Sequence, residues 1–247
     1  MSAAPSKAML MAAGLGLRMR PLSDLPKPMI PVDGIPLVDR ALSWLEQYGI
    51  QEVVVNTHYR SDLMQGHLAV RTHPHITISH EDELLETGGG IVKALPLLGD
   101  EPFFAINSDV ICIDGATPAL AQMARQWNDA QMDALLLLQP VDHAVGYSGA
   151  GDFFMDDAGK LTRRGQNARA PYVFTGVQLL HPRLFTNVPP GRFSMNVLYD
   201  RLLQPGAPRS LYGLVHDGAW LHVGDPAGVS LAEQYLQQSA KKRVTQN

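Results

Sequence analysis

The sequence predicts a single α/β domain in which a mainly parallel sheet carries helices on both faces. Apolar strand patterns and amphipathic helix patterns alternate over most of the 247 residues. Residues 53–55 (Val-Val-Val) and 135–138 (four leucines) are apolar without interruption, which is typical of strands buried on both faces of a parallel sheet. Polar or glycine-rich segments follow several strands, at the edge where ligands of open α/β sheets bind.

Composition limits the classes of partner. The net charge is −4 and no long basic run occurs, which argues against nucleic acid as the main partner. No stretch approaches the roughly twenty apolar residues of a membrane helix, and no targeting segment is evident, so no membrane partner is expected. The single cysteine, Cys112, permits no internal disulfide. A cytoplasmic protein is therefore expected.

The domain is expected to span residues 1–240, followed by a polar tail at 241–247. In its first half, a strand over 8–13 leads into a glycine turn. A helix over 36–48 is predicted because Leu37, Ala41 and Leu45 recur every fourth residue and Gly49 ends the pattern. The next predicted elements are a strand at 52–56, a helix at 61–70, a strand at 76–80, a helix at 91–98 and a strand at 102–109.

The second half begins with a helix over 117–128, for which Thr117 is a suitable N-cap and Pro118 a suitable first residue. Residues 146–171 are rich in short strands and polar turns, and are expected to form an antiparallel insertion that covers one side of the ligand pocket. The remaining predicted elements are strands at 133–141 and 172–180, a helix at 195–203, a strand pair at 211–215 and 219–223 turned at 216–218, and a helix at 225–239.

The first strand runs directly into Gly14 and Gly16, the feature around which the functional prediction is built. Glycine lets the backbone turn sharply, and successive N–H groups in such a turn form an anion-binding concavity. Arg18 adds a charged fork suited to phosphate oxygens, and Lys27 is held between two prolines. These features together predict a polyphosphate site, although the two glycines alone would equally fit a tight turn.

Two common phosphate loops are excluded. The dinucleotide-binding fingerprint needs a third glycine where Met19 stands, which disfavours a dehydrogenase. The P-loop needs Gly-Lys followed by Ser or Thr, and this sequence is also absent.

Five segments spread over nearly the whole chain carry a recognisable set of motifs. They are 11–22 (Met-Ala-Ala-Gly-Leu-Gly-Leu-Arg-Met-Arg-Pro-Leu), 26–28 (Pro-Lys-Pro), 86–90 (Glu-Thr-Gly-Gly-Gly), 107–109 (Asn-Ser-Asp) and, imperfectly, 220–226 (Trp-Leu-His-Val-Gly-Asp-Pro). In this combination the chain resembles the sugar-phosphate nucleotidyltransferases (NDP-sugar pyrophosphorylases). The resemblance implies their Rossmann-like three-layer α/β/α fold. It also implies attack by a sugar 1-phosphate on the α-phosphorus of a nucleoside triphosphate, with release of pyrophosphate.

Within the family, the resemblance is nearest to the branch that uses UTP and N-acetylmuramate 1-phosphate, which serves the recycling of cell-wall sugars. The mannose-1-phosphate guanylyltransferase-like branch is next. The base, the sugar and the oligomeric state stay open. The lactyl carboxylate of N-acetylmuramate needs a cation or N–H donors. Candidates in the insertion, which are equally consistent with plain surface charges, are Lys160, Arg163, Arg164 and Arg169.

The resemblance implies a role for each matching residue. Arg18 would hold the β- and γ-phosphates, Lys27 would neutralise the α-phosphate, and Asp109 would bind Mg²⁺. The glycines at 88–90 are expected to present free N–H donors to the nucleobase. The implied nucleotide-binding residues are Ala12, Ala13, Gly14, Gly16, Arg18, Lys27, Glu83, Gly88, Gly89 and Asn107. The implied sugar-phosphate-binding residues are Asn107, Thr175 and Gly176.

His222 stands where the family usually carries a second metal-binding aspartate. Imidazole suits Mn²⁺ or Co²⁺ better than Mg²⁺, so the expected cofactor is Mg²⁺ or one of these softer ions. Other readings stay open: Asp225 or a water replaces the ligand, the protein is a catalytically weak homologue that binds nucleotide sugars, or His222 is a core histidine. Asp109 has its own structural alternative, a turn-forming acid after a strand.

Overall fold

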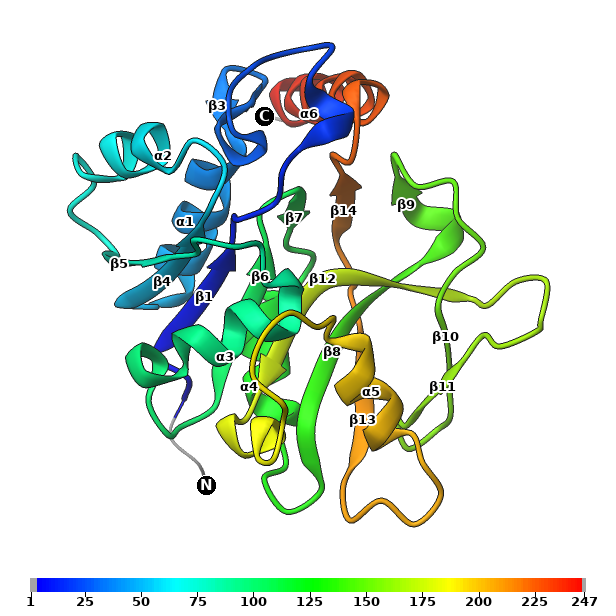
Figure 1. Cartoon of the computed structure of the whole chain (residues 1–247). Helices are drawn as coiled ribbons and strands as arrows, with labels where there is room; N and C mark the ends of the chain where they lie inside the picture. Colours follow the sequence, from blue (N-terminus) through cyan, green and yellow to red (C-terminus); the bar gives the residue numbers. More distant parts are fainter. Residues whose placement is uncertain (1–3, 246–247) are drawn as a thin grey trace.

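The computed structural model describes residues 4–245 (Figure 1). Within these residues, the centre is a nine-stranded sheet in the order β11-β10-β12-β6-β1-β4-β5, with β8 pairing with both β12 and β13. Its strands are β1 (Lys7–Met11), β4 (Glu52–Thr57), β5 (His75–His80), β6 (Phe103–Asn107), β8 (Met132–Pro140), β10 (Phe153–Met155), β11 (Leu161–Arg163), β12 (Tyr172–Leu180) and β13 (Ser210–Val215).

The large sheet is mixed, and the predicted parallel strands form its part around β1. β1 pairs in parallel with β4 and β6, β4 with β5, and β8 with β13. β12 runs antiparallel to β6 and β8, and β10 runs antiparallel to both β11 and β12. The polar ends of the parallel strands therefore meet at one edge of the sheet.

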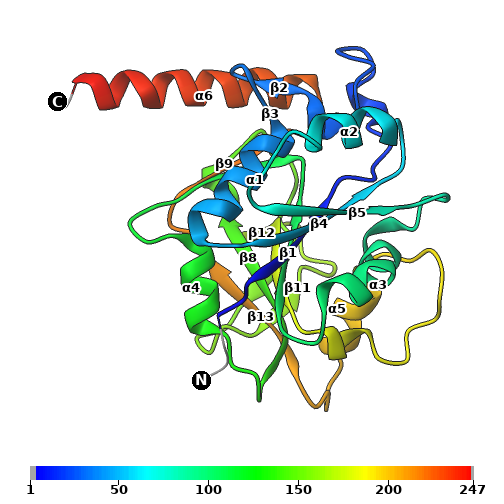
Figure 2. The same ribbon diagram turned by 90° about the vertical axis from the view of Figure 1, so that its left-hand side faces the viewer.

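Both faces of the sheet are covered by helices, which confirms the expected three-layer α/β/α arrangement (Figures 1 and 2). Alternate residues of β1 enter opposite cores: Leu10 packs on one side and Met9 on the other. This explains why such strands are apolar throughout. The first core also contains residues of α1 (Leu37–Tyr48), α2 (Ser61–Leu68) and α4 (Ala119–Gln126), and the second contains residues of α3 (Glu86–Leu98) and α5 (Asn196–Leu202).

A smaller unit lies above the carboxyl edge of the sheet. It contains a three-stranded sheet of β7 (Val110–Ile113), β14 (Ala219–His222) and β9 (Ala144–Val145), and the helix α6 (Pro226–Thr245), which projects beyond the body in Figure 2. Its core includes Met19 from the predicted phosphate loop and Val223 from the segment before α6. The remaining elements are η1 (Leu17–Met19), η2 (Lys27–Met29), β2 (Pro31–Val32), β3 (Ile35–Pro36), η3 (Val141–His143) and η4 (Pro182–Phe185).

The predicted pairing of the last two strands is wrong. β13 pairs with β8 in the large sheet, whereas β14 pairs with β7 and β9. His216 continues the alignment of β13, because its N–H donates to the Leu138 carbonyl at 2.8 Å. Two further differences follow. The strand β7 was not predicted. The helix α6 continues through 240–245, so most of the expected tail is helical. Residues 246–247 of that tail lie outside the described part of the chain.

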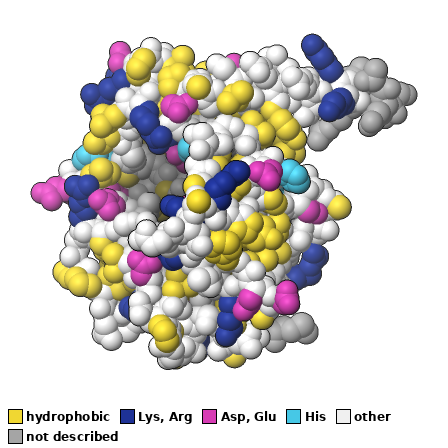
Figure 3. All heavy atoms as spheres, turned by 90° about the vertical axis from the view of Figure 1, so that its right-hand side faces the viewer, with side chains coloured by type: hydrophobic (Ala, Val, Ile, Leu, Met, Phe, Trp, Pro, Cys, Tyr) yellow, Lys and Arg dark blue, Asp and Glu magenta, His cyan; other side chains and the backbone are white. Residues whose placement is uncertain are grey.

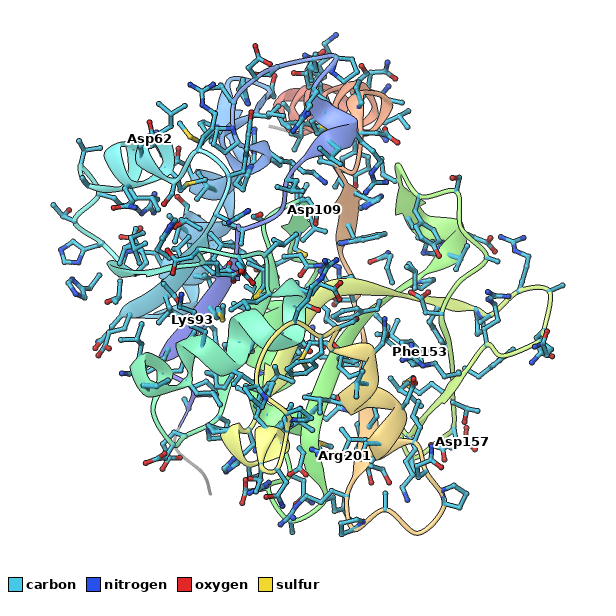
Figure 4. The ribbon with its side chains drawn as sticks, viewed as in Figure 1. Asp62, Lys93, Asp109, Phe153, Asp157 and Arg201 are labelled. Atoms are coloured by element: carbon cyan, nitrogen blue, oxygen red, sulfur yellow. The ribbon has the colours of Figure 1, made fainter. Side chains whose placement is uncertain are left out.

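The insertion at 146–171 contains the expected antiparallel hairpin, formed by β10 and β11. This hairpin extends the edge of the large sheet, and its turn, marked by Asp157 in Figure 4, lies away from Asp109. Over residues 4–245, no helix combines the length and the apolar character needed to cross a membrane.

Candidate active site

A cavity of about 620 Å³ opens where the parallel strands end. On the face shown in Figure 3 the surface is hollowed, and both basic (Lys, Arg) and acidic (Asp, Glu) side chains lie around the hollow. The cavity combines seven of the residues singled out from the sequence with others that were not. The predicted residues that line it are Ala13, Gly14, Gly16, Arg18, Lys27, Asn107 and Asp109.

The loop after β1 is shaped by close packing. Gly16 has a φ of +59°, and a Cβ at this position would lie 3.0 Å from the Cβ of Lys27. Glycine is therefore needed for both the left-handed backbone and the approach of the lysine segment. Met19 is buried in the core with Val223 and anchors the loop. Arg18 is exposed and lines the cavity, so its guanidinium is available to a ligand anion.

Lys27 and Asp109 form an ion pair inside the cavity. The Lys27 Nζ lies 2.7 Å from Asp109 Oδ2, with 12% and 26% of the two side chains exposed. Lys27 begins η2, in which Pro28 is buried, and Asp109 lies in the turn between β6 and β7 (Figure 4). The same ammonium donates to the Gly224 carbonyl at 3.4 Å. Three distant segments thus meet at one charged centre.

Asn56 and Glu81 also line the cavity, and neither was predicted. The Ala12 N–H donates to Asn56 Oδ1 at 2.7 Å, and Asn56 Nδ2 donates to Glu81 Oε1 at 2.7 Å. Asn56 and Asn107 are register partners of Met11 on the two strands that flank β1. A polar residue that ends an apolar strand was the available signal. This signal pointed to Asn107, and the sequence carries the same signal at Asn56, which was not predicted.

Glu83, by contrast, is exposed and does not line the cavity. Its neighbours do: Glu81, Leu84, Glu86 and Thr87. The other Glu81 oxygen accepts from the Leu85 N–H at 3.0 Å, so the buried Glu81 carboxylate fixes the turn that contains Glu83, the residue expected to bind the nucleotide.

The glycines at 88–90 differ from expectation. They lie inside α3, and the N–H groups of Gly88 and Gly89 both donate to the Phe193 carbonyl, at 2.9 and 3.2 Å. They are therefore not free donors for a base. A Cβ on Gly88 would lie 2.2 Å from the Phe193 ring, and one on Gly89 would lie 2.3 Å from the Gly191 carbonyl oxygen. Close packing of residues 191–193 explains why both positions are glycine.

Thr175 and Gly176, the expected sugar contacts, do not line the cavity. Thr175 is fully buried, and its hydroxyl donates to the Leu137 carbonyl at 2.8 Å. A Cβ on Gly176 would lie 2.8 Å from Asn107 Nδ2. Gly176 thus leaves room for the Asn107 side chain, which does reach the cavity.

His222 ends β14, two residues before Gly224, and lies outside the cavity lining. Its ring stacks on Trp220 with centroids 5.7 Å apart, and its Nδ1 lies 3.4 Å from the Gly146 carbonyl oxygen. A Cβ on Gly224 would lie 2.5 Å from the ring, so His222 supports the residue whose carbonyl meets Lys27. Asp225 caps α6 instead, because its Oδ1 accepts from the Gly228 N–H at 2.9 Å.

The basic residues of the insertion also lie outside the cavity lining. Arg163 pairs with Asp200 at 2.8 Å and lies over the Phe153 ring. Arg164 donates to the Gly151 carbonyl at 3.0 Å, and Arg169 approaches Asp142. Neither these residues nor the rest of 146–171 covers the pocket as expected.

The motifs of this site match known sequences. Residues 7–151 match the nucleotidyl transferase family. The chain is 40% identical over 242 residues to N-acetylmuramate alpha-1-phosphate uridylyltransferase of Caulobacter vibrioides, covering 96% of this chain and 99% of that protein. The chain belongs to the nucleotidyltransferase family. The predicted sugar-phosphate nucleotidyltransferase is thereby confirmed at the level of the family.

Other relatives of this nucleotidyltransferase agree. A protein of the same name from Neisseria meningitidis serogroup B is 34% identical over 88% of this chain and 93% of its own length. Mannose-1-phosphate guanylyltransferases are more distant, at 26–27% identity. The solved structure of HddC from Yersinia pseudotuberculosis, complexed with GMP-PN, has the same fold, with a TM-score of 0.73 and 20% identity over 94% of this chain and 99% of HddC.

Proposed function

We propose that this nucleotidyltransferase transfers a uridylyl group from UTP to N-acetylmuramate 1-phosphate and releases pyrophosphate. The observation that carries the proposal is the convergence of Arg18, Lys27 and Asp109 in the cavity behind the glycine loop. The acceptor and the nucleotide are proposed from the names of the two uridylyltransferases reported above.

The reaction brings two anions together, so positive charge and alignment are the main requirements. The attacking phosphate oxygen is already ionised and needs no catalytic base. Lys27 would stabilise charge that develops on the α-phosphate, and the exposed Arg18 would bind the phosphates that leave as pyrophosphate. Asn107 would orient the acceptor phosphate from the end of β6.

The donor set of the cavity fits Mg²⁺ or Mn²⁺. Within residues 4–245, no three His, Cys, Asp or Glu side chains gather closely enough to form a metal cage. Mg²⁺ does not require one, because it is commonly held by one or two carboxylates together with substrate phosphates and waters. Asp109 would supply the carboxylate, and a bound cation would neutralise the phosphate oxygens. His222 is proposed as the residue that shifts preference toward Mn²⁺ or Co²⁺.

A cytoplasmic location is part of the proposal and is supported by the single cysteine. The second candidate is guanylyl transfer to mannose 1-phosphate, which the lower identity of those relatives makes less favoured.

The test is an activity screen. UTP, GTP, CTP and ATP are each mixed with a panel of sugar 1-phosphates and a divalent cation. Pyrophosphate release is followed, and the sugar nucleotide is identified by mass. The fastest release is expected with UTP and N-acetylmuramate 1-phosphate. A higher kcat/KM for GTP with mannose 1-phosphate would favour the second candidate. Binding without release for every pair would indicate a nucleotide-sugar-binding protein.

A further inference from the structure

We propose that Lys27 is the counter-ion that fills the cation position of Asp109 in the nucleotide-free protein. In this state it lowers the affinity of the carboxylate for a divalent cation, until a polyphosphate draws the ammonium away. This inference rests on the proposed function, which assigns Lys27 to phosphate and Asp109 to a metal ion. Nucleotide binding and metal binding are then coupled through one lysine side chain.

The geometry of the pair supports this arrangement. The Nζ–Oδ2 separation of 2.7 Å is that of a direct charge-assisted hydrogen bond. Over residues 4–245, Asp109 has no other ion pair. Both residues line the cavity and remain partly exposed, unlike a structural pair that is closed within a core. The cation position of Asp109 is therefore taken while the cavity remains open to a ligand.

The two proposed roles exclude one another in this arrangement. An ammonium in contact with Asp109 repels a divalent cation at the same carboxylate, and it is not directed at a phosphate. A nucleoside triphosphate carries several negative charges, which compete with the single charge of Asp109 for the lysine. Transfer of the ammonium to a phosphate oxygen exposes the carboxylate, so each ligand favours binding of the other.

The side chain can move without a change of fold. The Lys27 backbone is held by η2, by buried Pro28 and by the close approach of Gly16. Among residues 4–245, however, its ammonium donates only to Asp109 and, at a longer distance, to the Gly224 carbonyl. Four flexible side-chain carbons separate that fixed backbone from the charge. Exchange between Asp109 and a phosphate therefore needs only rotamer changes.

The test uses Mn²⁺ alone, titrated into full-length protein without nucleotide and followed by the electron paramagnetic resonance signal of free Mn²⁺. Lys27→Met is expected to bind Mn²⁺ about tenfold more tightly than the parent, because a cation beside the carboxylate is removed. Lys27→Arg keeps the charge and is expected to bind as weakly as the parent. Adding Asp109→Asn to Lys27→Met should abolish the gain.

A second measurement follows UTP binding in EDTA by calorimetry. Lys27→Met is expected to weaken metal-free UTP binding about tenfold. General damage to the fold would weaken the binding of both Mn²⁺ and UTP. The inference instead requires tighter Mn²⁺ binding and weaker UTP binding. Lys7→Met is a matched control, since Lys7 pairs with Glu52 at 2.9 Å at the other end of β1. It should change neither affinity. Lys27→Gln provides a second neutral variant if the methionine variant unfolds.

The inference is overturned if neutral variants of Lys27 bind Mn²⁺ no better than the parent, or if the gain survives Asp109→Asn. It is also overturned if UTP binding in EDTA is unchanged. The outcome is separable from the activity screen. Opposite affinity shifts without pyrophosphate release would support the inference and count against the proposed function.

Discussion

The side-chain amide of Asn56 donates to the carboxylate of Glu81 at 2.7 Å, and both side chains are at least 98% buried. Through this contact, the end of β4 holds two walls of the cavity at once. Asn56 accepts from the Ala12 N–H on one side, and Glu81 accepts from the Leu85 N–H on the other. Moving any of these groups would leave a buried polar atom without a hydrogen bond, which costs free energy. The network therefore fixes the positions of its members.

Gly90→Ala is expected to break this contact. The new Cβ would lie 2.7 Å from Glu81 Oε1 and 3.0 Å from Asn56 Nδ2. We expect a loss of about 1–3 kcal/mol in the free energy of unfolding, which is the usual cost of overpacking. Nucleotide binding should weaken with it. Urea unfolding and calorimetric titration with UTP measure the two effects.

Gly66→Ala is the matched control, because it lies in α2 and a Cβ there meets no atom within 4 Å. This change should stabilise the protein by about 0.5–1 kcal/mol, as glycine-to-alanine changes in helices normally do. Equal stabilisation by both substitutions would show that the Asn56–Glu81 contact does not require glycine at position 90.

Asp109→Ala is expected to remove metal-dependent turnover, with a loss of at least about a hundredfold in kcat. The reason is that the carboxylate would be the principal protein ligand of the ion. Initial rates measured across a Mg²⁺ titration test this. Asp157→Ala, in the exposed turn of the insertion, should match the parent. If Asp109→Ala kept the activity and titration curve of the parent, the metal site would lie elsewhere.

His222→Asp is expected to shift the order of activating metals toward Mg²⁺, because an oxygen ligand replaces a nitrogen ligand. The parent should be more active with Mn²⁺ or Co²⁺ than with Mg²⁺. The Gly146 carbonyl near Nδ1 would leave Nε2 as the available ligand atom. His222→Asn removes the imidazole without adding a carboxylate and separates the two effects. Identical metal rankings in all three proteins would assign His222 to the core alone.

His216 predicts a pH dependence of stability. Burial lowers the pKa of this imidazole, whose Nε2 finds no hydrogen-bond partner in the described part of the chain, residues 4–245. The unfolded chain therefore binds a proton more readily than the folded protein once the pH falls below about 6.5. Stability should be complete above that pH and decline as the pH decreases toward the lowered folded pKa. Burial also lowers the pKa of His181, so both histidines should contribute to the loss of stability at low pH.

Replacing His216 by glutamine should flatten part of this decline between about pH 7.5 and 5.5, as measured by urea unfolding. His143→Gln, at an exposed position in η3, is the control. An unchanged pH dependence in the His216 variant would remove this residue as a source of the acid sensitivity.

Strands and charged groups were predictable from the sequence where burial and local geometry decide the outcome. β1 and β8 are covered on both faces, so their central residues are apolar without interruption, and this pattern predicted them. Gly14, Gly16 and Lys27 share one short segment, so their meeting in the cavity follows from local geometry. The parallel pairing of β13 with β8 was missed, because a short turn at 216–218 looks the same whether or not its strands pair with each other.

The glycines at 88–90 show a second limit. A run of small residues at a helix start fits an open binding surface and close packing equally well. The difference depends on Phe193, which is about a hundred positions away in the sequence and supplies the carbonyl that binds Gly88 and Gly89. Glu81 was missed for a related reason. Its role depends on Asn56, which a reading of the local sequence does not connect to it.

Turnover by Lys27→Ala is the most direct test that this cavity performs nucleotidyl transfer. The lysine begins the short 3₁₀ turn η2, and its ammonium points into the cavity rather than into a hydrophobic core, so the fold should persist, as judged by circular dichroism and the unfolding midpoint. Loss of its charge at the α-phosphate should raise the barrier by about 3 kcal/mol, so kcat for pyrophosphate release should fall roughly a hundredfold. A folded Lys27→Ala variant with a kcat within about a factor of two of the parent would contradict the assignment.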